Sequence, residues 1–272
     1  MKAFAISIIC VVVLCAFGLP LAHSSGSIQG GPPSNLVAHW AFDEGTGSTA
    51  GDSSGNGYDG TIHGAAWAAG KSGNALDFNG INNYVAIGAS ASLDNMKAIS
   101  FEAWIKPKAD THWHVLDKGD GDKRLYAEGN NLTLDGRVRY DTGGTHAYSQ
   151  SVNHTVLLGE WQHVAMTWNI SDNTTRLYHN GAEVSYRSQS VGTVHVQNDN
   201  DFPFTIGARG ALGSGTFFNG TIDEVYLWNR TLTPAEILSH YNSQKIPEPA
   251  AVLLLAPAIF FICALSVRRK AN

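Results

Sequence analysis

The chain has 272 residues, of which 10% are aromatic, 15% are charged and 29 are glycine. This length suits one large all-β domain or two small ones, and so few charges with so many glycines favour tight turns over a helical bundle. The formal net charge of −5 excludes nucleic acid as the expected partner, because phosphate binding needs positive charge.

The first segment, residues 1–24, is predicted to be a signal peptide. Lys2 supplies a positive start, an apolar run follows over residues 3–19, and Ala22-His23-Ser24 offers small residues where a signal peptidase cleaves. An uncleaved N-terminal anchor is the alternative. Residues 25–34 are rich in Gly, Pro and Ser and are predicted to be a linker.

Short apolar runs separated by turn residues fill the next part of the chain. Residues 99–105 alternate with period two, as one face of a strand requires, and Asn180-Gly181 is a strong hairpin signal. Residues 43–60 are predicted to form a long loop. Strands are predicted at 36–42, 75–78, 84–87, 99–105, 161–168, 176–178, 183–186, 204–207 and 220–228.

One short helix is predicted after the last strand. Thr233 is a good N-cap, Pro234 suits the first helical position, and Glu236 completes a capping box, with the helix reaching about His240. Many strands and one terminal helix predict an all-β, two-sheet antiparallel sandwich. We expect its core to contain Trp40, Phe42, Phe78, Phe101, Trp104, Trp161, Val164, Leu177 and Val225.

The C-terminal end has three parts. Residues 243–249 form a linker that contains Pro247-Glu248-Pro249, residues 250–267 carry no charge, and residues 268–272 begin with Arg268-Arg269-Lys270. Eighteen helical residues span about 27 Å, enough for the apolar part of a bilayer. The basic cluster predicts a transmembrane helix with a cytoplasmic C-terminus.

This tail resembles the PEP-CTERM sorting signal of exopolysaccharide-producing bacteria. The resemblance implies export, anchoring in the membrane through the C-terminal helix, processing near Pro247-Glu248-Pro249 by an exosortase, and a final place at the cell surface, outer envelope or extracellular matrix. A plain transmembrane anchor is the alternative.

Trimming both ends changes the charge and cysteine inventory. Without Lys2, Arg268, Arg269 and Lys270, 14 of the 18 basic residues remain against 23 acidic ones, so the exported part would carry −9. All three cysteines lie in the two terminal segments. The exported domain therefore cannot use a disulfide or a thiolate metal site.

Six segments between the two ends together resemble one domain family. They are residues 36–45, 52–57, 73–80, 100–105, 161–165 and 220–230, and they resemble the laminin-G-like, or concanavalin-like lectin/glucanase, domains over residues 35–242. The resemblance implies a jelly-roll sandwich. It does not specify a ligand, because this fold carries lectins, hydrolases, adhesion modules and scaffolds.

A calcium site is predicted in the loop after the first strand. The resemblance implies a structural Ca²⁺ held by Asp52, by the region of Asn56 and Gly57, and by Asp223 from the last strand. Carboxylates and backbone carbonyls on a glycine-rich loop are suitable ligands. A hydrogen-bonded turn, in which Asp52 and Asp223 accept backbone N–H groups, is the alternative.

Sugar recognition needs an exposed aromatic face beside polar groups, and residues 137–150 supply that mixture. Cross-strand packing of the aromatic residues is the alternative. The candidate ligand-binding residues are Trp113, Tyr126, Arg139, Tyr140, Asp141, His146 and Tyr148.

Two further clusters carry side chains that could bind a metal ion. His112 and His114 share a strand face and could hold a transition metal or rim a sugar site around Trp113. The aspartates at 117, 120 and 122 could hold a cation, although a solvated loop tip is the simpler interpretation.

Catalysis is not expected. Asp223 and Glu224 are adjacent and therefore point to opposite faces of a strand, whereas Glu102 and Glu183 stand alone, so the pair of carboxylates that a glycosidase needs is missing. The predicted function is an exported, non-catalytic module that binds a polysaccharide, such as the exopolysaccharide, or a glycoprotein. A protein adhesion or scaffold module is the alternative, followed by a glycoside hydrolase.

Overall fold

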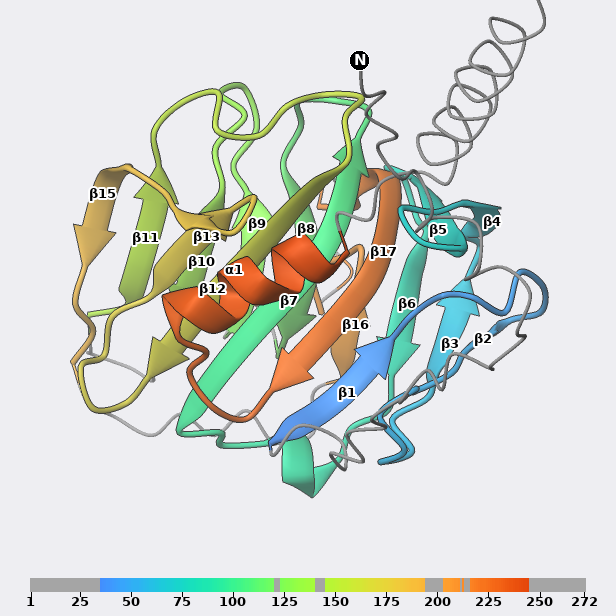
Figure 1. Cartoon of the computed structure of the whole chain (residues 1–272), viewed down its shortest axis with the longest axis horizontal. Helices are drawn as coiled ribbons and strands as arrows, with labels where there is room; N and C mark the ends of the chain where they lie inside the picture. The colour runs from blue at the N-terminus through green and yellow to red at the C-terminus, as the bar shows by residue number, and fades with distance from the viewer. Residues whose placement is uncertain are drawn as a thin grey trace, which may run out of the picture. The chain divides into compact units, whose positions relative to one another are not determined.

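The computed structural model describes residues 35–119, 123–139, 145–193, 203–210, 212 and 216–244. These residues form two antiparallel sheets packed against each other, with a helix across the far side of one sheet (Figure 1). The all-β sandwich with one short C-terminal helix is thereby confirmed. The expected signal segment 1–24, linker 25–34, Pro247-Glu248-Pro249 motif, tail helix 250–267 and basic tail 268–272 lie outside the described residues.

Sheet A has eight strands. Seven run in the order β14-β13-β12-β7-β17-β5-β4, and β1 pairs with β17. The first and last strands of the domain therefore lie side by side. The strands are β1 (Leu36–Trp40), β4 (Ala66–Ala69), β5 (Asn74–Asn79), β7 (Ala98–Pro107), β12 (Gln162–Asn169), β13 (Arg176–His179), β14 (Ala182–Glu183) and β17 (Asn219–Trp228).

Sheet B has nine strands in the order β15-β11-β10-β9-β8-β16-β6-β3-β2. The strands are β2 (Thr49–Ala50), β3 (Gly60–His63), β6 (Tyr84–Ile87), β8 (Trp113–Lys118), β9 (Lys123–Ala127), β10 (Asp135–Val138), β11 (Ala147–Ser151), β15 (Tyr186–Ser190) and β16 (Phe204–Ile206). A short 3₁₀ helix, η1 (Ala91–Leu93), follows β6.

The main core lies between the two sheets. Of the nine predicted core residues, seven belong to it, whereas Trp104 is buried on the far side of sheet A and Trp161 is only half-buried just before β12. Trp104 differs because β7 alternates: Phe101, Ala103 and Ile105 face sheet B, and Trp104 stacks on Tyr241 of the helix, with ring centroids 5.7 Å apart.

The helix α1 (Pro234–Ser243) begins as predicted. Thr233 accepts a hydrogen bond from the backbone N–H of Glu236, and the Glu236 side chain accepts one from the backbone N–H of Thr233, which completes the capping box. Its buried residue Ile237 packs with Tyr178, Trp228 and other residues of sheet A. No helix within the described residues is long and apolar enough to cross a membrane.

The Asn180-Gly181 turn joins β13 to β14 as the sequence indicates. Both residues have positive φ, 50° and 80°, and Tyr178 and His179 pair with Glu183 and Ala182 across it. These angles suit the two-residue turns whose twist matches a hairpin. The strand predicted at 183–186 is divided, because β14 ends at Glu183 and β15 begins at Tyr186 in the other sheet.

Seven strands were not predicted from the sequence: β2, β3, β4, β8, β9, β10 and β11. All but β4 belong to sheet B. Their segments carry charged or polar residues at alternate positions, for example Arg124 in β9 and Asp135 and Arg137 in β10. Polar residues that alternate with small or apolar ones weaken the apolar pattern by which strands are recognised.

Candidate functional site

The face of sheet B that points away from sheet A carries a set of polar and aromatic side chains. Backbone pairing places Arg124 opposite Arg137, Arg137 opposite Tyr148, and Tyr148 opposite Ser190, in one row across four strands. Tyr126 and Asp135 pair in the neighbouring row. Because side chains alternate along strands, these residues share the outer face while Leu125 and Gly136 between them face the core.

Gly136 brings this part of sheet B close to sheet A. A Cβ at this position would lie 2.7 Å from Leu177 Cδ2 and 2.8 Å from Met166 Sδ. Its two neighbours, Asp135 and Arg137, therefore project outward from a strand that is seated directly on the core.

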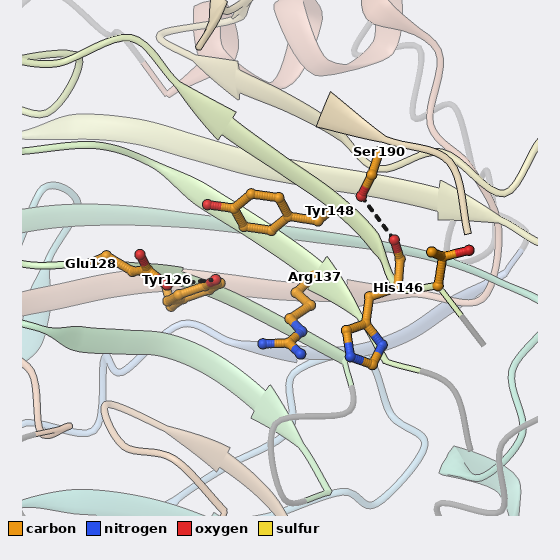
Figure 2. A pocket seen from close by; sticks show the side chains of 7 residues that line it. Tyr126, Glu128, Arg137, His146, Tyr148 and Ser190 are labelled. Atoms are coloured by element: carbon orange, nitrogen blue, oxygen red, sulfur yellow. Dashed lines mark hydrogen bonds between the residues drawn. The ribbon is translucent and has the colours of Figure 1, made fainter. Parts of the chain in front are cut away.

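A pocket of ≈ 440 Å³ opens on this outer face. Its volume lies in the range usual for small-ligand sites. Figure 2 shows Glu128 and Tyr126 at one end and His146 and Ser190 at the other, with Tyr148 and Arg137 between the two ends. The pocket is lined by Tyr126, Glu128, Arg137, Thr145, His146, Tyr148 and Ser190.

Asp135 supports this pocket from beneath. Its side chain is fully buried and accepts hydrogen bonds from the hydroxyls of Tyr148, at 3.0 Å, and Thr133, at 2.6 Å, and from the backbone N–H of Glu128. Burial raises the pKa of Asp135 above its usual value. The carboxyl group thus holds the Tyr148 ring in place and offers no free oxygen to the pocket.

Tyr126 lines the pocket with its edge rather than with an open ring face, since only 1% of the residue is exposed. The Arg124 guanidinium lies 4.1 Å from its ring centroid, and the rings of His112 and His114 lie 6.0 and 5.4 Å away. A bound sugar could therefore stack on Tyr148, which is half-buried, but not on Tyr126.

The seven candidate ligand residues divide as follows. Tyr126, His146 and Tyr148 come together at the pocket, whereas Trp113 does not. Arg139 is half-buried nearby, and its charge helps to lower the pKa of His146, after burial and the charge of Arg137. Tyr140 and Asp141 lie outside the described residues.

The prediction that Trp113 is a sugar platform was wrong. Its side chain is fully buried in the core between the sheets and meets Phe218 edge to face, with ring centroids 5.1 Å apart. The reason is strand alternation: His112 and His114 occupy the outer face, so Trp113 between them must point inward. No group of three or more metal-binding side chains forms within the part of the chain that the structure describes.

The loop tip proposed around Asp117 was also wrong at that residue. Asp117 lies in β8, is fully buried, and pairs with His114 Nδ1 at 2.9 Å. Residues 120 and 122 lie outside the described ranges.

The Asp52 region fits a hydrogen-bonded turn. The Asp52 carboxylate accepts from the backbone N–H groups of His39, Ser54 and Tyr58 and from the Ser54 hydroxyl. Asn56 donates its amide to the carbonyls of residues 36 and 37 in β1. The oxygens that Ca²⁺ would need at Asp52 already have protein donors.

Asp223 is engaged elsewhere. It accepts from the backbone N–H groups of Lys71, Ser72 and Glu224, and burial raises its pKa to about 7. The predicted ligands Asp52, Asn56, Gly57 and Asp223 are therefore not assembled around one point by any contact found here, and the residues as arranged do not fit a preformed Ca²⁺ site. Calcium stays a prediction.

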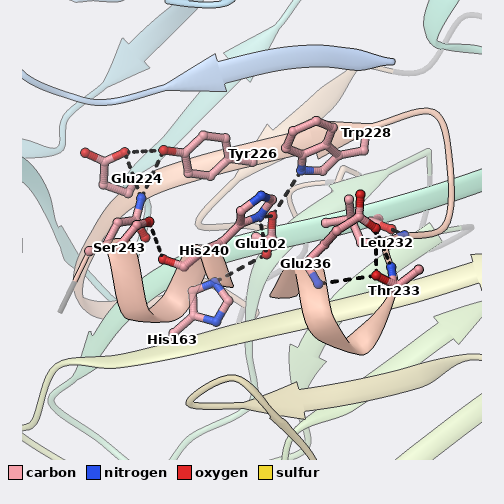
Figure 3. A network of polar contacts seen from close by, with 12 residues as sticks. Glu102, His163, Glu224, Tyr226, Trp228, Leu232, Thr233, Glu236, His240 and Ser243 are labelled. Atoms are coloured by element: carbon pink, nitrogen blue, oxygen red, sulfur yellow. Dashed lines mark hydrogen bonds and ion pairs between the residues drawn. The ribbon is translucent and has the colours of Figure 1, made fainter. Parts of the chain in front are cut away.

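A second polar cluster lies between α1 and sheet A (Figure 3). Glu102 is fully buried, accepts from Trp228 Nε1 at 3.0 Å, and pairs with His240 at 2.9 Å and His163 at 3.6 Å. Burial lowers the pKa of His163 to about 4, and the bond to Glu102 raises that of His240. These groups attach the helix to the sheet.

Glu224 belongs to the same layer. It pairs with His39 Nε2 at 2.7 Å and accepts from the Tyr226 hydroxyl at 2.8 Å. The register of β17 shifts between Asp223 and Tyr226, and Glu224 has a φ of 48°, so this bulge interrupts the strand alternation that the sequence argument assumed.

Sequence reasoning missed several functional candidates. Arg137 and Ser190 lie on β10 and β15, Glu128 and Thr145 lie just outside strands, and all four line the pocket. Arg124 pairs with Arg137 from β9. The alternation of charged residues in 123–127 and 135–138 was the available signal, but only the strand register shows that they meet.

Comparison with known proteins gives a consistent picture of the fold. Residues 79–238 match the family model Laminin_G_3, described as the concanavalin A-like lectin/glucanases superfamily. Among curated proteins, human Pentraxin-4 is 23% identical over 173 residues, which is 60% of this chain and 35% of Pentraxin-4. The chain thus spans about a third of the length of that relative.

Solved structures with the same fold come from diverse proteins. The binding domain of Paraclostridial Mosquitocidal Protein 1 aligns with a TM-score of 0.61 and 16% identity over 77% of this chain and 52% of that one. Trypanosoma rangeli sialidase, solved with sialic acid, aligns with a TM-score of 0.59 and 19% identity over 79% and 34%. Domain 4 of the arabinanase AbnA from Geobacillus stearothermophilus, solved with arabinotriose, aligns with a TM-score of 0.51 and 23% identity over 75% and 97%. At these identities the similarity establishes the fold alone.

Proposed function

The chain belongs to the concanavalin A-like lectin/glucanase superfamily, and we propose that it is a non-catalytic saccharide-binding protein whose site is the outer-face pocket on sheet B. The observation that carries the proposal is the lining of that pocket. The half-buried ring of Tyr148 stands beside Arg137, His146 and Glu128, with the hydroxyls of Thr145 and Ser190. An aromatic face surrounded by hydrogen-bonding groups suits a sugar ring, which presents both C–H and O–H groups.

The related structures support a saccharide as the ligand class. The arabinanase domain was solved with arabinotriose, and the sialidase with sialic acid. For this chain those ligands serve only as a guide to the kind of molecule to test.

The absence of catalysis is part of the proposal. Glycoside hydrolysis needs two carboxylates about 5–5.5 Å or about 6.5–9.5 Å apart across the scissile bond. Within the described lining, Glu128 alone supplies a carboxylate, and the oxygens of nearby Asp135 are taken by Thr133, Tyr148 and the Glu128 N–H.

The proposal also includes export and attachment to the cell envelope. It is supported by the sequence of residues 1–24, of Pro247-Glu248-Pro249 and of residues 250–272. The intact mass of the protein recovered from its producing cells tests it, because processing near Pro249 removes the uncharged segment and the basic end.

Binding to a polysaccharide panel tests the proposed function. The full-length chain is applied to neutral and acidic polysaccharides, including the exopolysaccharide of the producing cells, with calcium and then with EDTA. We expect binding to at least one polymer and no release of reducing sugar. Tyr148→Ala should weaken that binding about tenfold or more, whereas Tyr84→Ala, on the same sheet but outside the pocket lining, should not.

Folding is verified for each variant by near-ultraviolet circular dichroism. Folded wild-type protein that binds no polymer in either buffer would overturn the saccharide proposal and favour protein adhesion. Release of reducing sugar that disappears in Glu128→Gln would instead show an enzyme.

A further inference from the structure

Arginine charge gathers at the pocket without a paired carboxylate among the described residues, on Arg137 in the lining and on Arg124 paired with it. Arg176 and Arg230 each have a carboxylate partner, Asp172 and Glu236. Neither Arg124 nor Arg137 has one among the described residues, and the Nε–H of each is buried without a hydrogen-bond acceptor. Buried donors usually find a partner, so each of these two Nε–H groups could still donate to an acceptor oxygen of a ligand.

The two arginines reinforce each other. Their backbones are directly paired across β9 and β10, and both side chains lie on the outer face. Burial and then the charge of Arg124 lower the pKa of Arg137, and the charges of Arg137, Arg139 and Arg124 add to burial in lowering that of His146. An anion bound beside these like charges would offset their mutual repulsion, which favours its binding.

The nearby acids do not cancel this charge. Glu128 lines the pocket at the end away from His146, with Arg137 between them (Figure 2), and its Oε1 lies 3.5 Å from the Tyr126 hydroxyl. Its charge raises the pKa of Arg137, but less than burial and the charge of Arg124 lower it. Asp135 is buried beneath the pocket, and burial raises its pKa, which favours the uncharged form. The pocket is therefore polarised along its length.

We propose that this pocket selects saccharides that carry an oxyanion, a uronate carboxylate or a sulfate ester, and that the guanidinium of Arg137 binds that group with Arg124 behind it. The inference deepens the saccharide-binding function proposed above and rests on it. A guanidinium presents paired N–H donors that match the two oxygens of a carboxylate or sulfate. The sugar ring would stack on Tyr148, with the hydroxyls of Thr145 and Ser190 at its edge.

The charge of the whole chain makes this inference specific. The net charge of −5 disfavours general attraction of polyanions. Attraction to an anionic polymer would therefore report a local site rather than a basic surface.

Two pairs of polymers that differ only in charge test the inference. One pair is polygalacturonate and its carboxyl-reduced form, and the other is dextran sulfate and dextran. Affinities of the full-length chain are measured for all four, which also distinguishes a carboxylate from a sulfate ligand. The variants are Arg137→Gln, Arg137→Lys and Arg176→Gln, the last of which makes the same charge change on sheet A.

We expect wild type to bind at least one anionic polymer about tenfold or more tightly than its neutral partner. Arg137→Gln should abolish most of that difference. Arg137→Lys should retain part of the difference, because the positive charge remains while the paired N–H donors of the guanidinium are lost. Arg176→Gln should leave the difference within about twofold of wild type. Circular dichroism and thermal unfolding confirm that each variant is folded.

Three results would overturn the inference. Equal affinity for charged and neutral partners, or tight binding only to neutral saccharides, would refute it while the saccharide-binding function stands. Equal losses in Arg137→Gln and Arg176→Gln would place the anion elsewhere. No binding to any polysaccharide, here or in the wider panel, would refute the proposed function and this inference with it.

Discussion

Single residues in this protein owe their roles to the face on which they lie. Trp113, flanked by His112 and His114, looked like a sugar platform and is a core residue. Tyr148, three strands away in the same sheet, is held by Asp135 at the pocket. Both are aromatic residues among polar neighbours, so composition alone cannot distinguish them, whereas strand alternation and register can.

His163 shows what burial does to one titratable group. It faces Glu102, His240 and His179, and burial lowers its pKa to about 4, against about 6.5 in an unfolded chain. The unfolded state therefore binds a proton first as the pH falls. The stabilising contribution is full above about pH 6.5 and is lost as the pH falls through about 4.

We predict that His163→Gln removes this part of the acid sensitivity. Between about pH 7.5 and about pH 4, the free energy of unfolding of wild type should fall by about 3 kcal/mol more than that of the variant. Urea unfolding at the two pH values measures both. Equal acid losses in the two proteins would show that His163 is not held neutral in the fold.

At the scale of elements, α1 combines a local signal with a tertiary one. Its N-cap and capping box can be read from residues 233–236 and are present. Its docking on sheet A depends on Ile237, which is fully buried against Ala165, Tyr178 and Trp228. The adjacent Leu238 is 45% exposed and provides a matched control.

We predict that Ile237→Ala lowers the free energy of unfolding by about 2–5 kcal/mol, or releases the helix, because it leaves a cavity between helix and sheet. Leu238→Ala should change it by less than about 0.5 kcal/mol. Denaturant unfolding with hydrogen exchange of residues 234–243 distinguishes global from local loss. Similar effects in both variants would contradict the packing of Ile237 against sheet A.

For the whole molecule, stability comes from the core between two sheets and from the polar layer under α1. The described residues include no cysteine, and the Asp52 turn is closed by hydrogen bonds from the protein itself. The fold as described needs no cation to complete that turn.

We predict that EDTA leaves thermal unfolding nearly unchanged. A calcium ion bound at about 100 times its Kd would add about 2.7 kcal/mol of stability, which raises the midpoint by several degrees in a domain of this size. Differential scanning calorimetry with millimolar calcium and then with EDTA makes the comparison. A clear rise with calcium that is lost in Asp52→Asn would restore the predicted calcium site.

The sequence by itself determined the fold class, the strands with strong apolar patterns, the Asn180-Gly181 turn and the start of α1. Each of these depends on neighbours within a few residues, where periodicity and capping act. Tertiary structure decided the site. Arg124, Arg137, Tyr148 and Ser190 lie on four different strands, and only their register places them in one row. That register is set by burial of the opposite face, as at Gly136 against Leu177 and Met166, and no local pattern in the chain records it.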